Sequence, residues 1–134
     1  MAQHTGVVLG VGGVAVWNDS ILLIRKGRGP AQGVWMVPGG KVELGEPVAV
    51  AVVREVFEET GLEVVVEEFL GWVERIDDDQ HFVILDFTVT PLDPTAALMA
   101  GDDAAEARWV PLSEVSELRL VDGLYEFLHD HNVL

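Results

Sequence analysis

Residues 40–62 read GKVELGEPVAVAVVREVFEETGL, a pattern typical of one helix held between glycines. Pro47 suits the first position of a helix, Glu46 suits its cap, and Gly61 suits the left-handed residue just past its end. The segment therefore predicts a helix from Pro47 to about Thr60. At about 100° per residue, four apolar side chains share one side of this helix and are expected to face the core: Val50, Val53, Val56 and Phe57.

Three glutamates, Glu55, Glu58 and Glu59, fall on the opposite side of the predicted helix. Neighbouring like charges on a helix repel by roughly 0.2–0.5 kcal/mol per pair, and the negative end of the helix dipole disfavours anions in the last turn. Two interpretations remain open: a solvated acidic face, or a site for a divalent cation. Clustered carboxylate oxygens suit Mg²⁺, which would turn their repulsion into binding energy. Arg54 can pair with Glu58 on the surface or fix the orientation of a glutamate.

The segments on either side of this helix have β-strand patterns. We expect strands, a tight turn, a glycine-rich loop and a C-terminal helix, in chain order as follows: strand Val7–Trp17, turn Asn18–Asp19, strand Ile21–Arg25, loop Lys26–Gly40, strand Leu62–Trp72, acidic turn Asp77–Asp79, strand Phe82–Thr90, strand Arg108–Val110 and helix Leu120–His129. The glycines of Gly10–Gly13 are read as strand glycines that allow close packing. A chain of 134 residues is the size of one domain, so residues 1–134 are predicted to form a single α/β sandwich.

The composition excludes several classes of function. Eight basic against 23 acidic residues give a net charge of −15, which disfavours nucleic-acid partners and anionic membrane surfaces. The absence of cysteine excludes disulfides, thiolate zinc sites and cysteine nucleophiles. Met1–Asn18 carries no formal side-chain charge, but its four glycines and missing basic start favour a strand over a membrane span or signal peptide. We therefore expect a cytoplasmic protein.

Gly40, Glu46 and the run Arg54–Leu62 together resemble the Nudix box, G-x5-E-x7-R-E-U-x-E-E-x-G-U with U apolar. All nine specified positions match, which makes this a specific signal. The flanking residues 33–40 and 107–112 resemble the loop before the box and a late strand of the same family. The resemblance implies a Nudix-type α/β/α sandwich around a mixed β-sheet. It also implies hydrolysis, dependent on Mg²⁺ or Mn²⁺, of a nucleoside diphosphate linked to another group.

By this resemblance, the carboxylates of Glu55, Glu58 and Glu59 bind the metal, together with the backbone carbonyl of Gly39. Glu46 and Arg54 would support that geometry. The chemistry agrees, because the negative charge of a pyrophosphate repels hydroxide unless cations neutralise it.

A carboxylate must also take the proton of the attacking water. Glu58 is the first candidate for this base, and a later loop offers Asp103 first and Glu106 second. Asp102, Asp103 and Glu106 can equally form a solvated acidic loop. The predicted catalytic residues are thus Glu58, Glu55, Arg54 and Asp103.

Four further residues are candidates for substrate binding: Arg28, Trp35, Lys41 and His81. Arg28 and Lys41 belong to a segment, residues 20–41, that contains no acidic side chain. Such a segment can guide an anion towards the glutamates or be ordinary solvated loop. Trp35 can stack on a nucleobase or anchor its loop in the core. His81 precedes a strand that resembles one in bacterial Nudix proteins assigned as ADP-ribose pyrophosphatases, although an edge-strand histidine is the alternative.

The leading hypothesis is hydrolysis of ADP-ribose to AMP and ribose 5-phosphate. An enzyme that removes pyrophosphate from oxidised or non-standard nucleoside triphosphates, of the MutT type, is the alternative within enzymes. A nucleotide-sensing module without turnover is the alternative outside them. The expected partner is a small nucleotide, and analogy with the family suggests a homodimer.

Overall fold

The computed structural model describes residues 6–134, so the first five residues of the expected domain lie outside the described part. The elements of the described part follow in chain order: β1 (Val8–Val14), β2 (Val16–Trp17), β3 (Ser20–Lys26), β4 (Trp35–Met36), β5 (Gly39–Lys41), α1 (Val48–Thr60), β6 (Val64–Ile76), β7 (His81–Pro91), β8 (Ala104–Pro111), the 3-10 helix η1 (Leu112–Glu117) and α2 (Leu124–Asp130).

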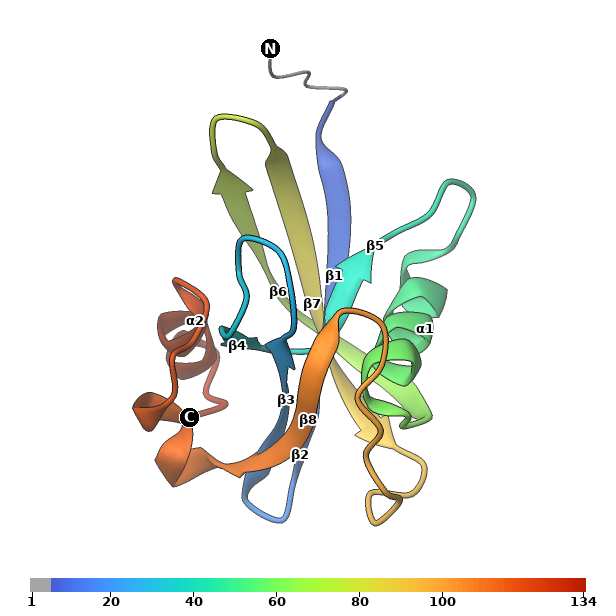
Figure 1. Ribbon diagram of the computed structural model, residues 1–134. Helices are drawn as coiled ribbons and strands as arrows, with labels where there is room; N and C mark the ends of the chain where they lie inside the picture. The colour runs from blue at the N-terminus through green and yellow to red at the C-terminus, as the bar shows by residue number, and fades with distance from the viewer. Residues whose placement is uncertain (1–5) are drawn as a thin grey trace.

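The strands form two four-stranded sheets. The first has the order β5-β1-β7-β6 and is mixed, because β1 and β7 run parallel while the other neighbours are antiparallel. The second joins β2, β3 and β4, with β8 also paired to β3. Helix α1 lies on one side of the strands and α2 on the other (Figure 1). The α/β class and the mixed sheet between helices are confirmed.

Helix α1 packs closely on β1 because β1 contains glycine at the contact. A Cβ built on Gly13 would lie 2.8 Å from Cγ2 of Val56, so a larger residue would push the helix away. Val52 and Val56 are fully buried in the core cluster beneath α1. Gly12 points to the other face of the sheet, where a Cβ would overlap the carboxylate of Asp86. The expectation that these strand glycines allow close packing is confirmed.

The expected core-facing side of α1 is correct for Val56 and Val53, which lie in or against the core, and wrong for the other two residues. Val50 and Phe57 are each 51% exposed, whereas Glu55 and Glu59 are 6% and 3% exposed. The helix buries Ala51 and Val52 together with the expected Val56. Because its valines occur on almost every side, the apolar pattern did not select one face, and the glycines opposite α1 leave room for acidic side chains.

The ends of the helices also differ from the sequence expectation. Helix α1 has Pro47 as its N-cap, and no side chain caps it, so Glu46 does not serve as the cap. Gly61 adopts the expected left-handed conformation, with φ 79°. Helix α2 begins at Leu124 and not at Leu120, because left-handed Gly123 precedes it and Leu120 forms a β-bridge with Trp35.

Several strands are longer than expected, and the turns are as predicted. Asn18 and Asp19 both have positive φ, as a two-residue hairpin turn requires. Asp77 Oδ1 accepts backbone N–H groups from Asp79 and Gln80 in the acidic turn. The loop at residues 26–40 contains the short strand β4 and the beginning of β5. None of the helices in residues 6–134 has the length and apolar content to span a membrane.

Candidate active site

Three segments meet at the C-terminal half of α1: the helix itself, the start of β5 and the loop that leads into β8. Glycines allow the close approach on both sides. A Cβ built on Gly40 would overlap Oε2 of Glu55, and one built on Gly101 would overlap the backbone carbonyl of Glu58. The two glycines therefore let β5 and the loop approach the helix and its acidic side chains.

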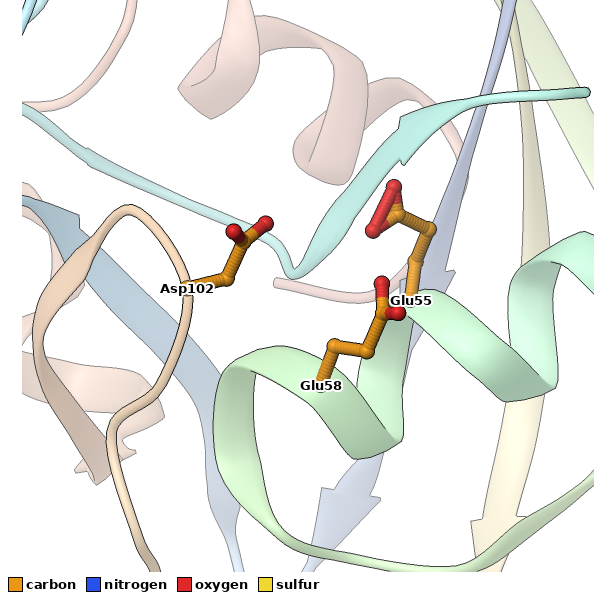
Figure 2. A group of neighbouring side chains, drawn as sticks. All are labelled: Glu55, Glu58 and Asp102. Carbon is orange, nitrogen blue, oxygen red and sulfur yellow. The ribbon is translucent and has the colours of Figure 1, made fainter.

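Three carboxylates converge at this meeting point. Oxygen atoms of Glu55, Glu58 and Asp102 all lie within 4.8 Å of one another (Figure 2). Glu55 is buried, while Glu58 and Asp102 are exposed, so the group is open to solvent on one side. The structure thus brings together two glutamates singled out in the sequence and one aspartate that was grouped with the solvated loop.

Asp103 pairs with basic residues, whereas Asp102 lies in the carboxylate cluster. Its carboxylate accepts a 2.6 Å hydrogen bond from Nε of Arg28 and lies 3.8 Å from Nζ of Lys26. Hydrogen bonding to Arg28 lowers the pKa of the Asp103 carboxyl. Among the described residues, Asp102 and not Asp103 lies in the carboxylate cluster, so the geometry favours Asp102 as the loop's contribution to the site. Gly101, immediately before Asp102, is the feature of the sequence that could have indicated the close approach of this loop to α1.

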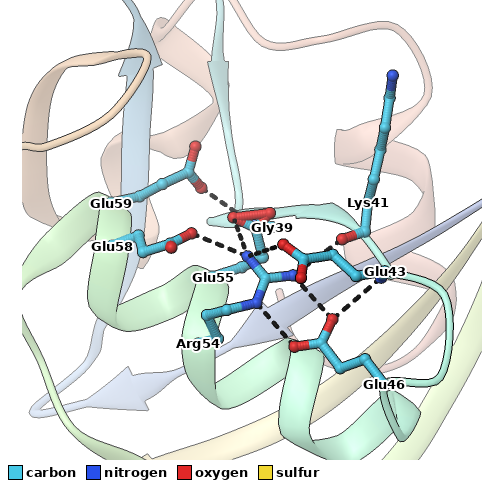
Figure 3. Close-up of polar contacts among 8 residues, drawn as sticks. All are labelled: Gly39, Lys41, Glu43, Glu46, Arg54, Glu55, Glu58 and Glu59. Atoms are coloured by element: carbon cyan, nitrogen blue, oxygen red, sulfur yellow. Dashed lines mark hydrogen bonds and ion pairs between the residues drawn. The ribbon is translucent and has the colours of Figure 1, made fainter.

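Glu59 lies beside the cluster and is held from β5. The backbone N–H of Gly39 donates a 2.7 Å hydrogen bond to Oε1 of Glu59 (Figure 3). Burial raises the pKa of Glu59 to about 8, although the Gly39 N–H opposes this effect. Burial also raises the pKa of Glu55 to about 7, against the opposing charge of Arg54. The neighbouring positive groups therefore do not offset the effect of burial on the carboxyl groups of Glu55 and Glu59.

Arg54 connects the box residues through its guanidinium group. Its Nε and Nη2 donate to the two oxygens of Glu46 at 2.7 and 2.9 Å, and Nη1 donates to Oε1 of Glu58 at 2.9 Å (Figure 3). Nη2 also donates to the backbone carbonyl of Lys41 at 3.0 Å. The hydrogen bond from Arg54 lowers the pKa of Glu46 to about 2. Arg54 therefore fixes Glu58 relative to β5 and the loop before α1.

The candidate substrate residues lie in different places. Arg28 lines a cleft of about 290 Å³ with Asp102 and Asp103, next to the carboxylate cluster. The side chain of Lys41 points away from the glutamates (Figure 3). Trp35 is 7% exposed and packs in the core, with the Arg108 guanidinium 4.7 Å from its ring centroid. His81 begins β7 and pairs with Glu74, 2.5 Å away. Only Arg28 of these four lines that cleft.

Comparison with known proteins agrees with this geometry. The NUDIX domain model matches residues 7–131. An ADP-ribose pyrophosphatase of Methanocaldococcus jannaschii is 39% identical over 110 residues, which cover 81% of this chain and 64% of that protein. A putative 8-oxo-dGTP diphosphatase of Bacillus subtilis is 34% identical over 101 residues, 72% of this chain and 62% of that protein. The chain thus spans a little under two thirds of the length of these curated relatives.

A solved structure gives the same result. The crystal structure of a MutT NUDIX hydrolase from Burkholderia pseudomallei superposes with a TM-score of 0.79 at 28% identity, covering 92% of this chain and 97% of that one. The mixed sheet with a glutamate-bearing helix against it is thus shared with a solved Nudix structure. The chain belongs to the Nudix hydrolase family, whose members act on phosphoanhydride bonds.

Separate substitutions of Asp102 and Asp103 test which of the two takes part in catalysis. We expect Asp102→Asn to lower kcat by about 10- to 100-fold, because it removes a negative oxygen from the carboxylate cluster. Asp103→Asn should change kcat by less than about threefold, since Asp103 is occupied by Arg28. Steady-state rates of both variants on the same nucleotide, with saturating Mg²⁺, measure the difference. Equal losses, or a larger loss for Asp103→Asn, would contradict the assignment.

Proposed function

We propose that this chain is a divalent-cation-dependent pyrophosphohydrolase that cleaves ADP-ribose to AMP and ribose 5-phosphate. The observation that carries the proposal is the convergence of Glu55, Glu58 and Asp102 within 4.8 Å, beside Glu59 and Gly39. Arg54 pairs with Glu58 at 2.9 Å and lies 3.6 Å from Glu55, but one guanidinium does not balance three carboxylates, so a bound cation would stabilise them further. Similarity to the M. jannaschii ADP-ribose pyrophosphatase supports the choice of substrate.

The residues present fit a hard divalent cation. All the side-chain donors are carboxylate oxygens, which Mg²⁺ and Mn²⁺ prefer, and the exposed side of the cluster leaves room for substrate oxygens. Glu55, Glu58 and Glu59 would hold the ion, with Asp102 from the loop and the backbone carbonyl of Gly39. When bound, such a cation neutralises charge on the phosphoryl oxygens and makes a water molecule more acidic.

The chain's own residues perform the remaining steps. Glu58, on the exposed side of the cluster and oriented by Arg54, accepts the proton of the attacking water. Arg28 contributes positive charge at the cleft, where it can contact the diphosphate or its leaving group. Lys41 and His81 stay candidates for substrate contact. Trp35 stays a candidate as well, although its side chain is buried in the core. Arg54 and Glu46 are positioning residues.

A second candidate function is the removal of pyrophosphate from oxidised nucleoside triphosphates. Similarity to the putative 8-oxo-dGTP diphosphatase of B. subtilis favours it, and its catalytic groups would be the same. The alternative without turnover, a nucleotide-sensing module, is disfavoured because a pure binding domain does not need Arg54, Glu55, Glu58 and Glu59 together. The small nucleotide partner and the cytoplasmic location stay predictions from the sequence.

A panel of substrates separates the two enzymes. We expect the purified chain, with Mg²⁺ or Mn²⁺, to convert ADP-ribose to AMP and ribose 5-phosphate at least about tenfold faster, by kcat/KM, than it converts oxidised or ordinary triphosphates. The products are resolved by ion-exchange chromatography, and Glu59→Gln protein prepared in the same way controls for contaminating hydrolases. Preferential release of inorganic pyrophosphate from triphosphates would overturn ADP-ribose in favour of the second candidate. No cleavage of any compound would overturn both.

A further inference from the structure

The turn that brings Asp102 to the carboxylate cluster has an uncommon backbone conformation. Asp102 has φ 53°, in the left-handed region that residues with a Cβ atom rarely adopt. It follows Gly101 in a tight turn, which a 3.0 Å hydrogen bond from the Ala104 N–H to the Gly101 carbonyl closes. In Figure 2 the Asp102 side chain extends from this turn towards Glu55 and Glu58. A residue in such a conformation keeps it only where its surroundings hold it in place.

Helix α1 holds the chain on the N-terminal side of Asp102. The Met99 N–H donates a 2.8 Å hydrogen bond to the carbonyl of Thr60, the last residue of the helix. A Cβ built on Gly101 would lie 2.4 Å from the carbonyl oxygen of Glu58, so the turn begins in direct contact with the helix backbone. These contacts involve only residues before Asp102, and the residues after it must be held by another element.

The β-ladder between β3 and β8 does not continue regularly to the turn. The two strands pair in regular register as far as Arg25 and Glu106. The register then shifts, so that Lys26 lies opposite Ala104 and Ala105 is passed over. An extra residue of this kind interrupts a ladder and bends its strand. The chain between the turn and the regular part of β8 therefore depends on other contacts for its path.

Asp103 makes those contacts with both its side chain and its backbone. Oδ1 of its carboxylate lies 2.6 Å from Nε and 2.5 Å from Nη2 of Arg28, and Oδ2 lies 3.8 Å from Nζ of Lys26. The Gly27 N–H donates a 2.7 Å hydrogen bond to the Asp103 carbonyl. Three consecutive residues thus bind the one residue that follows Asp102. We call the contacts of Asp103 with residues 26–28 the Asp103 clasp.

The Asp103 clasp is compatible with the substrate contact proposed for Arg28. A guanidinium group has five N–H donors, and the clasp uses the edge formed by Nε and Nη2. The Arg28 side chain is 76% exposed and lines the cleft of about 290 Å³ together with Asp102 and Asp103. The remaining N–H groups of Arg28 can therefore contact an anion in this cleft while Asp103 stays bound.

We propose that Asp103 is a positioning residue, whose clasp to residues 26–28 holds the turn so that the Asp102 carboxylate stays beside Glu55 and Glu58. Without the clasp, Asp102 relaxes to the commoner negative φ, and its side chain leaves the cluster. Asp103 then touches neither the cation nor the substrate and acts through its neighbour. The inference rests on the proposed function, because it takes the carboxylate cluster to be the cation site.

A double-mutant cycle on Mn²⁺ affinity, measured by calorimetry without substrate, tests the proposal. Asp103→Ala should raise the dissociation constant at least about fivefold, and Asp102→Asn at least about tenfold. In protein that already carries Asp102→Asn, adding Asp103→Ala should change the constant by less than about twofold, because Asp103 acts only through Asp102. A contribution to general stability would instead multiply the two effects. Asp103→Asn keeps an Oδ1 acceptor for Arg28 and should stay within about threefold of the wild type.

Asp93→Ala is the matched control. It makes the same chemical change in the same β7–β8 connection, where Asp93 holds a local turn by accepting hydrogen bonds from the N–H and Oγ1 of Thr95 at 3.0 and 2.6 Å. The Mn²⁺ dissociation constant should stay within about twofold of the wild type. Circular dichroism confirms that each variant folds, and Asp103→Ser replaces Asp103→Ala if that variant does not.

Hydrogen exchange in the presence of a chelator separates this proposal from the proposed function. The amides of Gly27 and Ala104 donate within the clasp and the turn, and in Asp103→Ala they should exchange at least about tenfold faster without any metal. A wild type that does not bind Mn²⁺ would contradict the cation site, and the exchange rates then decide on the clasp. Unchanged exchange, unchanged Mn²⁺ affinity in a wild type that binds the ion, or an undiminished effect beside Asp102→Asn would each overturn the proposal.

Discussion

Glu59→Gln is expected to lower metal-dependent turnover at least about a thousandfold while the protein stays folded and becomes more stable without metal. Glu59 is 3% exposed and accepts the Gly39 N–H, which a glutamine oxygen can also accept. The substitution therefore keeps the shape and the hydrogen bond of the side chain. It removes the negative charge that a divalent cation needs at this position.

The gain in stability follows from the pKa of Glu59. Burial raises that pKa from 4.5 to about 8, so the folded protein disfavours the ionised carboxylate. Below about pH 4.5 the group is protonated in both the folded and the unfolded state and has no effect on stability. As the pH rises from there to 8, the unfolded state ionises first and the wild type loses free energy of unfolding. The advantage of Glu59→Gln should therefore grow over this range and be complete above pH 8.

Thermal unfolding in the presence of a chelator measures this effect. At about pH 8, Glu59→Gln should melt at least about 5 °C above the wild type, and the difference should shrink as the pH falls towards 5. Mg²⁺ should then raise the melting temperature of the wild type by more than that of the variant. Glu63→Gln, the same chemical change at an exposed residue, is the control and should alter neither rate nor melting temperature. A Glu59→Gln enzyme with wild-type rate would remove Glu59 from the mechanism.

The box positions were predictable from sequence because their spacing is fixed within one helix and its flanking turns. Gly61 in the left-handed conformation, Arg54 in reach of Glu58, and Glu55 and Glu58 close together all depend on short-range geometry. The family resemblance implied that Glu46 and Arg54 support the metal geometry, and the hydrogen bond between them is compatible with that role, whereas the expected helix cap at Glu46 is wrong. Local rules were sufficient where the partners are close in sequence.

The errors occurred where tertiary packing decides. The valines of α1 cover too many sides for periodicity to identify the buried one, and glycines on other segments made room for Glu55 and Glu59. Asp102 and Asp103 are adjacent and chemically identical, so only the path of their loop separates the cluster from the Arg28 ion pair. For Trp35 the sequence left stacking on a nucleobase and anchoring in the core open, and the packing places it in the core.

Asp86 illustrates an electrostatic feature that no sequence pattern indicates. It lies within a strand predicted from its apolar residues, and it is 5% exposed with Oδ1 lacking a hydrogen-bond partner within residues 6–134. Burial raises its pKa to about 6, against the opposing charges of Arg75 and His131. Its position over Gly12 depends on the parallel pairing of β1 with β7, which joins segments far apart in the chain.

The second large effect is expected from Gly40→Ala, which adds one methyl group beside the carboxylate cluster. A Cβ at this position would overlap Oε2 of Glu55 and lie 2.9 Å from Oε1, so the Glu55 carboxylate must move. The obstacle is the end of a side chain and not backbone, so we expect the fold to persist with a loss of about 1–3 kcal/mol or less. Metal-dependent kcat/KM should fall at least about 100-fold, because a displaced ligand oxygen weakens both cation binding and catalysis.

Two comparisons make this prediction specific to Glu55. Gly10→Ala places the same methyl group on the neighbouring strand, where the nearest atoms lie at an ordinary 3.4 Å, so its activity should stay within about twofold of the wild type. Adding Glu55→Asp to Gly40→Ala shortens the obstructed side chain, and it should restore part of the Mn²⁺ affinity measured by calorimetry. If Gly40→Ala binds Mn²⁺ and turns over like the wild type, the Glu55 carboxylate does not occupy its observed position during catalysis. The space that Gly40 leaves beside β5 is then not required for the metal ligand.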